Sequence, residues 1–173
     1  MKKNAIVGQS GGPTAVINAS LYGAVKAFRE SGADGHVLGM INGIEGFLAD
    51  HVMDLSTDLS DKELELLKLT PAAYLGSCRY KLPADLDSEV YPAIFDNFRE
   101  MNIGYFLYVG GNDSMDTVDK LSRYAEKIGS DVKFIGIPKT IDNDLVLTDH
   151  TPGFGSAAKY VASTVREIVL DAS

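Results

Sequence analysis

The stretch VKFIGIPKTIDND, residues 132–144, joins a strand-like apolar run to a short charged loop. The run over residues 132–137 is typical of a buried parallel strand, and Pro138 ends it. Lys139 and Asp142 then follow, within a loop that also carries a threonine and a second aspartate. In an open α/β sheet, ligands bind outside the carboxyl ends of the strands. We therefore expect a charged site here; the alternative is an ordinary solvated turn, which Asp and Asn favour.

Strand-like and helix-like segments alternate along the rest of the chain. Strands are expected over residues 5–7, 37–41, 51–55, 105–109 and 132–137. Helices are expected over 14–31, 89–101, 113–128 and 155–170, with one more after the capping-box sequence at residues 60–63. This order predicts an α/β fold: a doubly wound, mostly parallel, Rossmann-like sheet with helices on both faces in three layers.

Composition restricts the kinds of partner. The chain has 173 residues, a net charge of −8 and one cysteine, Cys78. An acidic protein is poorly suited to general binding of nucleic acid or a membrane surface, so neither is expected. A single cysteine excludes an internal disulfide framework and is typical of a cytoplasmic protein. Local amides, cations and Mg²⁺ can still bind phosphate within an acidic protein.

The segment 8–14, GQSGGPT, follows the first strand. Gly11 and Gly12 would let the backbone approach a phosphate closely, and the start of the next helix would supply free N–H groups and a positive dipole end. A tight strand-to-helix turn without a ligand is the alternative.

The segment 110–114, GGNDS, lies between another strand and helix. Its glycines, Gly111 included, permit positive φ and close ligand approach. Asn112 and Asp113 could contact a metal or phosphate, and Ser114 could donate a hydroxyl. Asp and Ser are also ordinary helix N-caps. Arg79, in the turn 76–79, could clamp phosphate with its planar guanidinium, or belong to an exposed basic loop.

In order and content, these motifs resemble those of the phosphofructokinase family: SGGP at 10–13, GSCR at 76–79, GGNDS at 110–114, PKTIDND at 138–144 and TDHTPGFG at 148–155. The resemblance spans essentially the whole chain but only about the first half of a usual family member. It implies that residues 1–173 are the phosphate-donor-binding lobe of a phosphofructokinase-like enzyme. The chain also ends at Ser173, directly after an apolar helix and without a closing strand, as expected for a fragment that is inactive alone.

Two positions resemble the pyrophosphate-dependent branch of the family. ATP-using members usually carry glycine where Asp113 and Lys139 stand. Asp113 would put bulk and a like charge where the α-phosphate of ATP passes. Lys139 would neutralise part of the pyrophosphate charge and stabilise the transferring phosphoryl group.

The resemblance also implies roles for other site residues. Asp142 would be the general base that accepts the proton of the 1-hydroxyl of fructose 6-phosphate, with Ile141 beside it. Thr140 would hold the sugar phosphate. Asp144 would support the base and the metal shell. The substrate-contacting residues implied by the resemblance are Gly11, Gly12, Arg79, Gly111, Ser114, Thr140, Ile141 and Asp142. Most members carry aspartate where Asn112 stands as a Mg²⁺ ligand, and asparagine offers only a neutral carbonyl.

The function implied is reversible, Mg²⁺-dependent phosphoryl transfer from pyrophosphate to fructose 6-phosphate in cytoplasmic glycolysis, by a homo-oligomer, dimer or tetramer. An ATP-dependent 6-phosphofructokinase and a non-catalytic regulatory subunit of the same fold are the alternatives.

Overall fold

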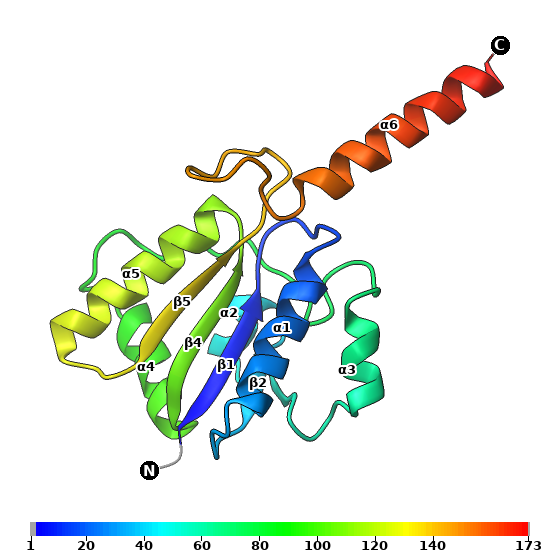
Figure 1. The fold of residues 1–173 in the computed structure, drawn as a ribbon. Coiled ribbons are helices and arrows are strands. Elements are labelled where there is room, and N and C mark those ends of the chain that lie inside the picture. Colours follow the sequence, from blue (N-terminus) through cyan, green and yellow to red (C-terminus); the bar gives the residue numbers. More distant parts are fainter. Residues whose placement is uncertain (1–2, 173) are drawn as a thin grey trace.

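The computed structural model describes residues 3–172 and contains one five-stranded sheet (Figure 1). The strands lie in the order β3-β2-β1-β4-β5. They are β1 (Asn4–Gln9), β2 (Val37–Met40), β3 (Val52–Asp54), β4 (Ile103–Gly110) and β5 (Lys133–Pro138). All neighbouring pairs are parallel except β2 and β3. The chain runs from β1 to one side and then returns to β4 on the other, so the strand order reverses between β1 and β4. Ligands bind at such switch points in doubly wound sheets.

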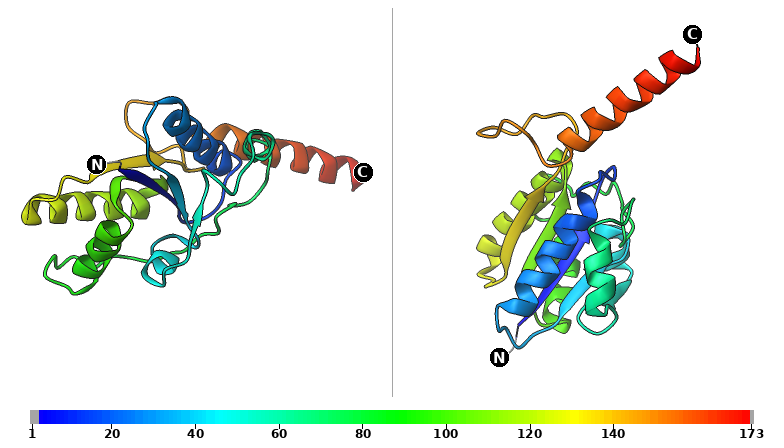
Figure 2. Two further views of the ribbon diagram at one scale, coloured as in Figure 1. Left: turned by 90° about the horizontal axis from the view of Figure 1, so that it is seen from below. Right: turned by 45° about the vertical axis from the view of Figure 1, so that its right-hand side comes forward.

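Helices cover both faces of this sheet, which confirms the predicted three-layer α/β fold. Figures 1 and 2 show α1 (Ile17–Glu30) on one face, with α3 (Asp61–Leu67) beside it. The other face is covered by α2 (Gly43–Leu48), α4 (Val90–Glu100) and α5 (Asn112–Ile128). Each face buries its own hydrophobic core. Burial of apolar area on both sides is the main force that stabilises the stack.

Strand register places alternate residues in the two cores. Ile6, Phe106 and Phe134 pair across three neighbouring strands and pack in the core beneath α4 and α5. The next row, Val7, Leu107 and Ile135, lies on the opposite face because successive side chains of a strand alternate. This shared register aligns the carboxyl ends of β1, β4 and β5, so the loops that follow them start at one edge.

The prediction that residues 132–137 form a buried strand is only partly correct. The strand exists, but Lys133 is exposed and Ile135 is 47% exposed. β5 is the edge strand of the sheet, and within residues 3–172 no helix covers Ile135 on its side. An apolar sequence run therefore indicated the strand correctly but overestimated its burial.

The first helix also begins later than expected, at Ile17 rather than residue 14. The Ile17 N–H donates to the Thr14 carbonyl oxygen at 3.2 Å, which makes residues 14–17 a turn. Ile17 is fully buried and fixes where the helix packs. The glycine-rich loop thus extends past Thr14 before the helix starts.

The last helix, α6 (Phe154–Asp171), projects away from the sheet (Figure 1). It has no buried residue, and its apolar side chains are exposed, among them Val161, Val165 and Ile168. Within residues 3–172 no helix has the length and apolar character needed to cross a membrane.

Candidate functional site

One cavity of about 430 Å³ lies at the carboxyl ends of β1, β4 and β5. The glycine-rich loop, the arginine turn, the start of α5 and the loop after β5 all contribute to its wall, whereas the motif at residues 148–155 does not. The lining residues are Ser10, Gly11, Gly12, Pro13, Thr14, Cys78, Arg79, Tyr80, Gly111, Asn112, Asp113, Ser114, Lys139, Thr140, Ile141 and Asp142. The loops that follow β1, β4 and β5 therefore line a single crevice, as expected for strand-to-helix turns at one edge of a sheet.

The glycine-rich loop is joined to the arginine turn by backbone hydrogen bonds. Gly11 has a φ of +74°, a left-handed conformation that glycine adopts without steric cost. Its N–H donates to the Cys78 carbonyl oxygen at 3.0 Å, and Ser77 Oγ donates to the Gly11 carbonyl oxygen at 2.5 Å. These bonds hold Arg79 beside the loop.

Two buried amide side chains, Gln9 and Asn18, anchor the segment that leads into the arginine turn. Gln9 Nε2 donates to Asn18 Oδ1 at 2.9 Å, and Gln9 Oε1 accepts from the Leu75 N–H at 2.8 Å. Asn18 accepts from the Tyr74 N–H and donates to two carbonyl oxygens of residues 70–72. Both side chains are at least 99% buried. This network could not be predicted from the sequence, because a Gln and an Asn nine residues apart form no recognisable motif.

Lys139 lies in the floor of the cavity, only 4% exposed. Its Nζ donates to the Gly12 carbonyl oxygen at 2.5 Å. Burial lowers the pKa of Lys139 below its usual value, and the nearby positive charge of Arg79 lowers it further. A buried ammonium group that has one backbone partner retains donors for an anion in the cavity.

The helix whose first turn lines this cavity is α5. α1 begins only at Ile17, which is not among the lining residues. The α5 N-cap is Gly111, with no side-chain cap, so neither Asp113 nor Ser114 serves as the N-cap. Gly111 has a φ of −85°, not the positive φ that the sequence suggested. Gly110 is instead required for close packing, because an added Cβ would lie 1.9 Å from Ser114 Oγ.

The first turn of α5 brings two predicted polar residues to the cavity. The Ser114 and Met115 N–H groups donate to the Gly111 carbonyl oxygen, which leaves the N–H groups of Asn112 and Asp113 without a partner in the helix, and the positive dipole end favours anions. Asp113 lines the cavity and pairs with Lys81, whose Nζ lies 3.2 Å from Asp113 Oδ1. Ser114 also lines it but is almost fully buried. Lys81 lies two residues after Arg79 in the chain, and its pairing with Asp113 could not be read from the sequence.

The loop after β5 is held by its neighbours and does not form a simple solvated turn. The Thr140 N–H donates to the Pro152 carbonyl oxygen at 3.0 Å. Asn143 Oδ1 accepts from the Thr151 N–H at 2.9 Å, with Asn143 in the left-handed region. Thr140 Oγ1 accepts from the Asp142 N–H at 3.0 Å. These bonds present Ile141 and Asp142 to the cavity with exposed side chains.

The two residues predicted to bind a metal lie next to each other. Asn112 Nδ2 donates to Asp144 Oδ2 at 3.0 Å, across the gap between α5 and the loop after β5. This bond leaves the Asn112 carbonyl oxygen and carboxylate lone pairs of Asp144 as oxygen ligands. Residues 3–172 contain no cluster of three or more His, Cys, Asp or Glu side chains suited to a metal.

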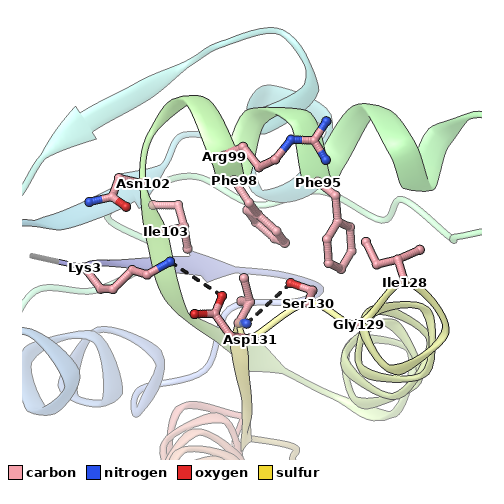
Figure 3. A pocket seen from close by; sticks show the side chains of 11 residues that line it. Lys3, Phe95, Phe98, Arg99, Asn102, Ile103, Ile128, Gly129, Ser130 and Asp131 are labelled. Atoms are coloured by element: carbon pink, nitrogen blue, oxygen red, sulfur yellow. Dashed lines mark hydrogen bonds and ion pairs between the residues drawn. The ribbon is translucent and has the colours of Figure 1, made fainter. Parts of the chain in front are cut away.

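A second cavity, of about 380 Å³, lies at the opposite end of the sheet (Figure 3). Phe95, Phe98 and Ile128 form its apolar side. Lys3 is paired with Asp131 at 3.5 Å. None of the residues predicted for the site lines this cavity.

Comparisons with known proteins show which family the chain resembles. The phosphofructokinase family matches residues 4–173. A pyrophosphate–fructose 6-phosphate 1-phosphotransferase from Halomonas elongata is 46% identical over 97% of this chain. A sulfofructose kinase from Alkalicoccus urumqiensis is 39% identical over 95% of it. A crystal structure of a pyrophosphate-dependent phosphofructokinase from Nitrosospira multiformis has a TM-score of 0.90 at 43% identity, covering 99% of this chain.

The chain spans about 40% of the length of these relatives, namely 40%, 41% and 42% of the three. The match over residues 4–173, the shared fold and the converging loops lead to one conclusion. The chain belongs to the phosphofructokinase family.

Proposed function

We propose that the full-length protein transfers a phosphoryl group from pyrophosphate to the 1-hydroxyl of fructose 6-phosphate. The observation that carries this proposal is the presence of both Asp113 and Lys139 in the wall of one cavity. The likeness to the pyrophosphate-dependent relatives supports it. On this proposal, residues 3–172 form the lobe that binds the phosphate donor.

The donor would lie against the glycine-rich loop and the start of α5. Lys139 supplies a buried positive charge there, and Arg79 adds a second cation at the wall. Pyrophosphate is small and highly charged, so two cations and free helix N–H groups suit it. Asp113 adds side-chain bulk and negative charge to the same wall, which disfavours a longer nucleotide triphosphate.

In the proposed transfer step, Asp142 is the general base. Its exposed carboxylate accepts the proton of the sugar 1-hydroxyl, and the hydroxyl oxygen attacks the nearer phosphorus of pyrophosphate. The bond from that phosphorus to the bridging oxygen breaks, and inorganic phosphate leaves. Lys139 stabilises the negative charge that develops on the transferring group. Thr140 fixes the backbone of Asp142 through its hydroxyl, and its proposed contact is the sugar phosphate.

The neighbouring side chains of Asn112 and Asp144 offer oxygen ligands of the kind that Mg²⁺ prefers. This ion binds through one or two protein oxygens together with donor phosphates, so a three-carboxylate cluster is not required. Asn112 and Asp144 would hold Mg²⁺, which supplies charge neutralisation of the pyrophosphate when bound.

A second acceptor is supported by the sulfofructose kinase relative. A sulfofructose would receive the phosphoryl group at the same site. Asp113 and Lys139 are proposed to bind pyrophosphate, and neither is proposed to contact the sulfonate or phosphate group of the sugar. Assays of the full-length protein with fructose 6-phosphate and with sulfofructose distinguish the two acceptors through their kcat/KM values.

Replacement of one side chain tests the donor assignment. In the full-length protein, Asp113→Gly should raise kcat/KM for ATP by about tenfold or more, because bulk and like charge leave the nucleotide path. The fructose 6-phosphate KM should stay within about twofold, since Asp113 acts on the donor. Unchanged kcat/KM for ATP would show that Asp113 does not exclude the nucleotide.

A further inference from the structure

Lys81 forms an ion pair with the proposed donor-selecting residue. Its Nζ lies 3.2 Å from Asp113 Oδ1. Asp113 lines the cavity, as do Arg79 and Tyr80, which immediately precede Lys81, whereas Lys81 itself is absent from the lining. The pair thus links the arginine turn to the first turn of α5 beside the cavity.

This pair contributes little to holding the fold together. Both side chains are more than 70% exposed, and exposed ion pairs stabilise proteins only slightly. The same segment is also attached to α5 at other points. Lys120 Nζ donates to the Leu82 carbonyl oxygen at 3.0 Å, and Lys127 forms an ion pair with Asp87. A contribution to the stability of the fold therefore does not explain the position of Lys81.

The charges in the cavity give Lys81 a more specific role. Asp113 places a carboxylate in a wall that must receive a polyanionic donor. Unpaired, that carboxylate would repel pyrophosphate as well as a nucleotide. The Lys81 ammonium group offsets this charge and holds the carboxylate towards the arginine turn. The size of the Asp113 side chain still obstructs a nucleotide. Its negative charge, which is partly neutralised by Lys81, repels pyrophosphate less.

We propose that Lys81 is a positioning residue for donor selectivity, which makes the Asp113 carboxylate compatible with pyrophosphate. This inference rests on the proposed function, because it assumes pyrophosphate as the donor. It predicts that the contribution of Lys81 to pyrophosphate binding depends on the presence of Asp113.

The test is a double-mutant cycle in the full-length protein, with Lys81→Met, Asp113→Gly and the combined variant. Lys81→Met should raise the pyrophosphate KM about three- to tenfold, as expected for one lost charge partner near a polyanion. The kcat and the fructose 6-phosphate KM should stay within about twofold. In the Asp113→Gly background, Lys81→Met should change the pyrophosphate KM by less than about twofold.

Two further variants separate charge from structure. Lys81→Arg should keep the pyrophosphate KM near the original value, because the positive charge is retained. Lys127→Met removes another Lys–Asp pair on α5, outside the cavity, and should leave the KM unchanged. Calorimetric binding of methylenediphosphonate, a non-hydrolysable pyrophosphate analogue, should weaken with Lys81→Met in parallel with the KM.

The possible failures are distinguishable. An equal rise in KM with and without Asp113 would mean that Lys81 contacts the donor directly, and would overturn the inference. No change in KM with Lys81→Met would also overturn it. Absence of pyrophosphate turnover in the unmodified full-length protein would refute the proposed function, and this inference with it.

Discussion

Lys139 Nζ donates a 2.5 Å hydrogen bond to the carbonyl oxygen of Gly12, joining residues 127 positions apart in the sequence. The bond places the buried cation directly against the glycine-rich loop. An added Cβ at Gly11 would lie 3.5 Å from the same Nζ. Gly11, Gly12 and Lys139 therefore form one continuous part of the cavity wall.

The two glycines of this loop should respond differently to alanine. Gly12 has no positive φ, and an added Cβ meets no atom within 4 Å. Gly12→Ala should leave thermal stability unchanged but raise the pyrophosphate KM about tenfold, if the donor occupies that space. Gly11→Ala should cost about 1–2 kcal/mol of stability, because its φ is left-handed. Thermal melting and steady-state kinetics of the full-length variants measure both effects. A normal KM in Gly12→Ala would show that the donor does not approach this loop.

The lowered pKa of Lys139 predicts a pH effect. As pH rises, Lys139 loses its proton, and kcat/KM for pyrophosphate should fall because the attracting charge is lost. Burial and Arg79 lower this pKa, so the fall should occur below the ordinary lysine value of 10.5. Lys139→Arg should remove this limb of the pH profile, since arginine stays charged.

Arg79→Met tests whether the charge of Arg79 influences the titration of Lys139. It removes the second cause of the lowered pKa, so the alkaline limb should move to higher pH. A limb that stays in place in both variants would exclude Lys139 as the titrating group.

Replacement of Asp142 tests the general base. Asp142→Asn in the full-length protein should lower kcat by about 10²–10⁴-fold, because the amide cannot accept the hydroxyl proton. The pyrophosphate KM should change little. Asp149→Asn, an exposed aspartate of the same loop outside the cavity wall, is the matched control and should be nearly neutral. A kcat within threefold of normal would remove Asp142 from this role.

Much of this site could be predicted from local sequence, because loops after parallel strands share one edge. Asp142 and Lys139 were found from residue type and position after a strand, and Asn112 and Asp144 do lie together. The Lys81–Asp113 pair could not be predicted, since it depends on how the arginine turn packs against α5. The exposure of Ile135 also depends on strand order, which an apolar run does not specify.

The buried amide network makes a prediction about stability. Asn18→Ala removes partners from the Tyr74 N–H and from the Thr70 and Ala72 carbonyl oxygens. Unsatisfied buried polar groups should cost about 2–3 kcal/mol. Hydrogen exchange at the Tyr74 and Leu75 amides should accelerate accordingly, and the pyrophosphate KM should rise as the arginine turn loosens.

Asn97→Ala provides the comparison for this change. Asn97 is partly buried, and its Nδ2 donates to the Phe47 carbonyl oxygen at 3.0 Å and, over a longer 3.5 Å, to Asp50 Oδ1. Asn97→Ala should lower the free energy of unfolding by less than Asn18→Ala does, and it should leave the pyrophosphate KM unaltered. Equal effects of the two variants would argue against a specific supporting role for Asn18.

The central claim is that the cavity at the ends of β1, β4 and β5 is built for pyrophosphate rather than a nucleotide. Phosphorylation of fructose 6-phosphate by the full-length protein with Mg²⁺, with pyrophosphate and ATP compared as donors, tests it most directly. We expect turnover with pyrophosphate and at most a trace with ATP. Turnover with ATP alone, or with neither donor, would contradict it.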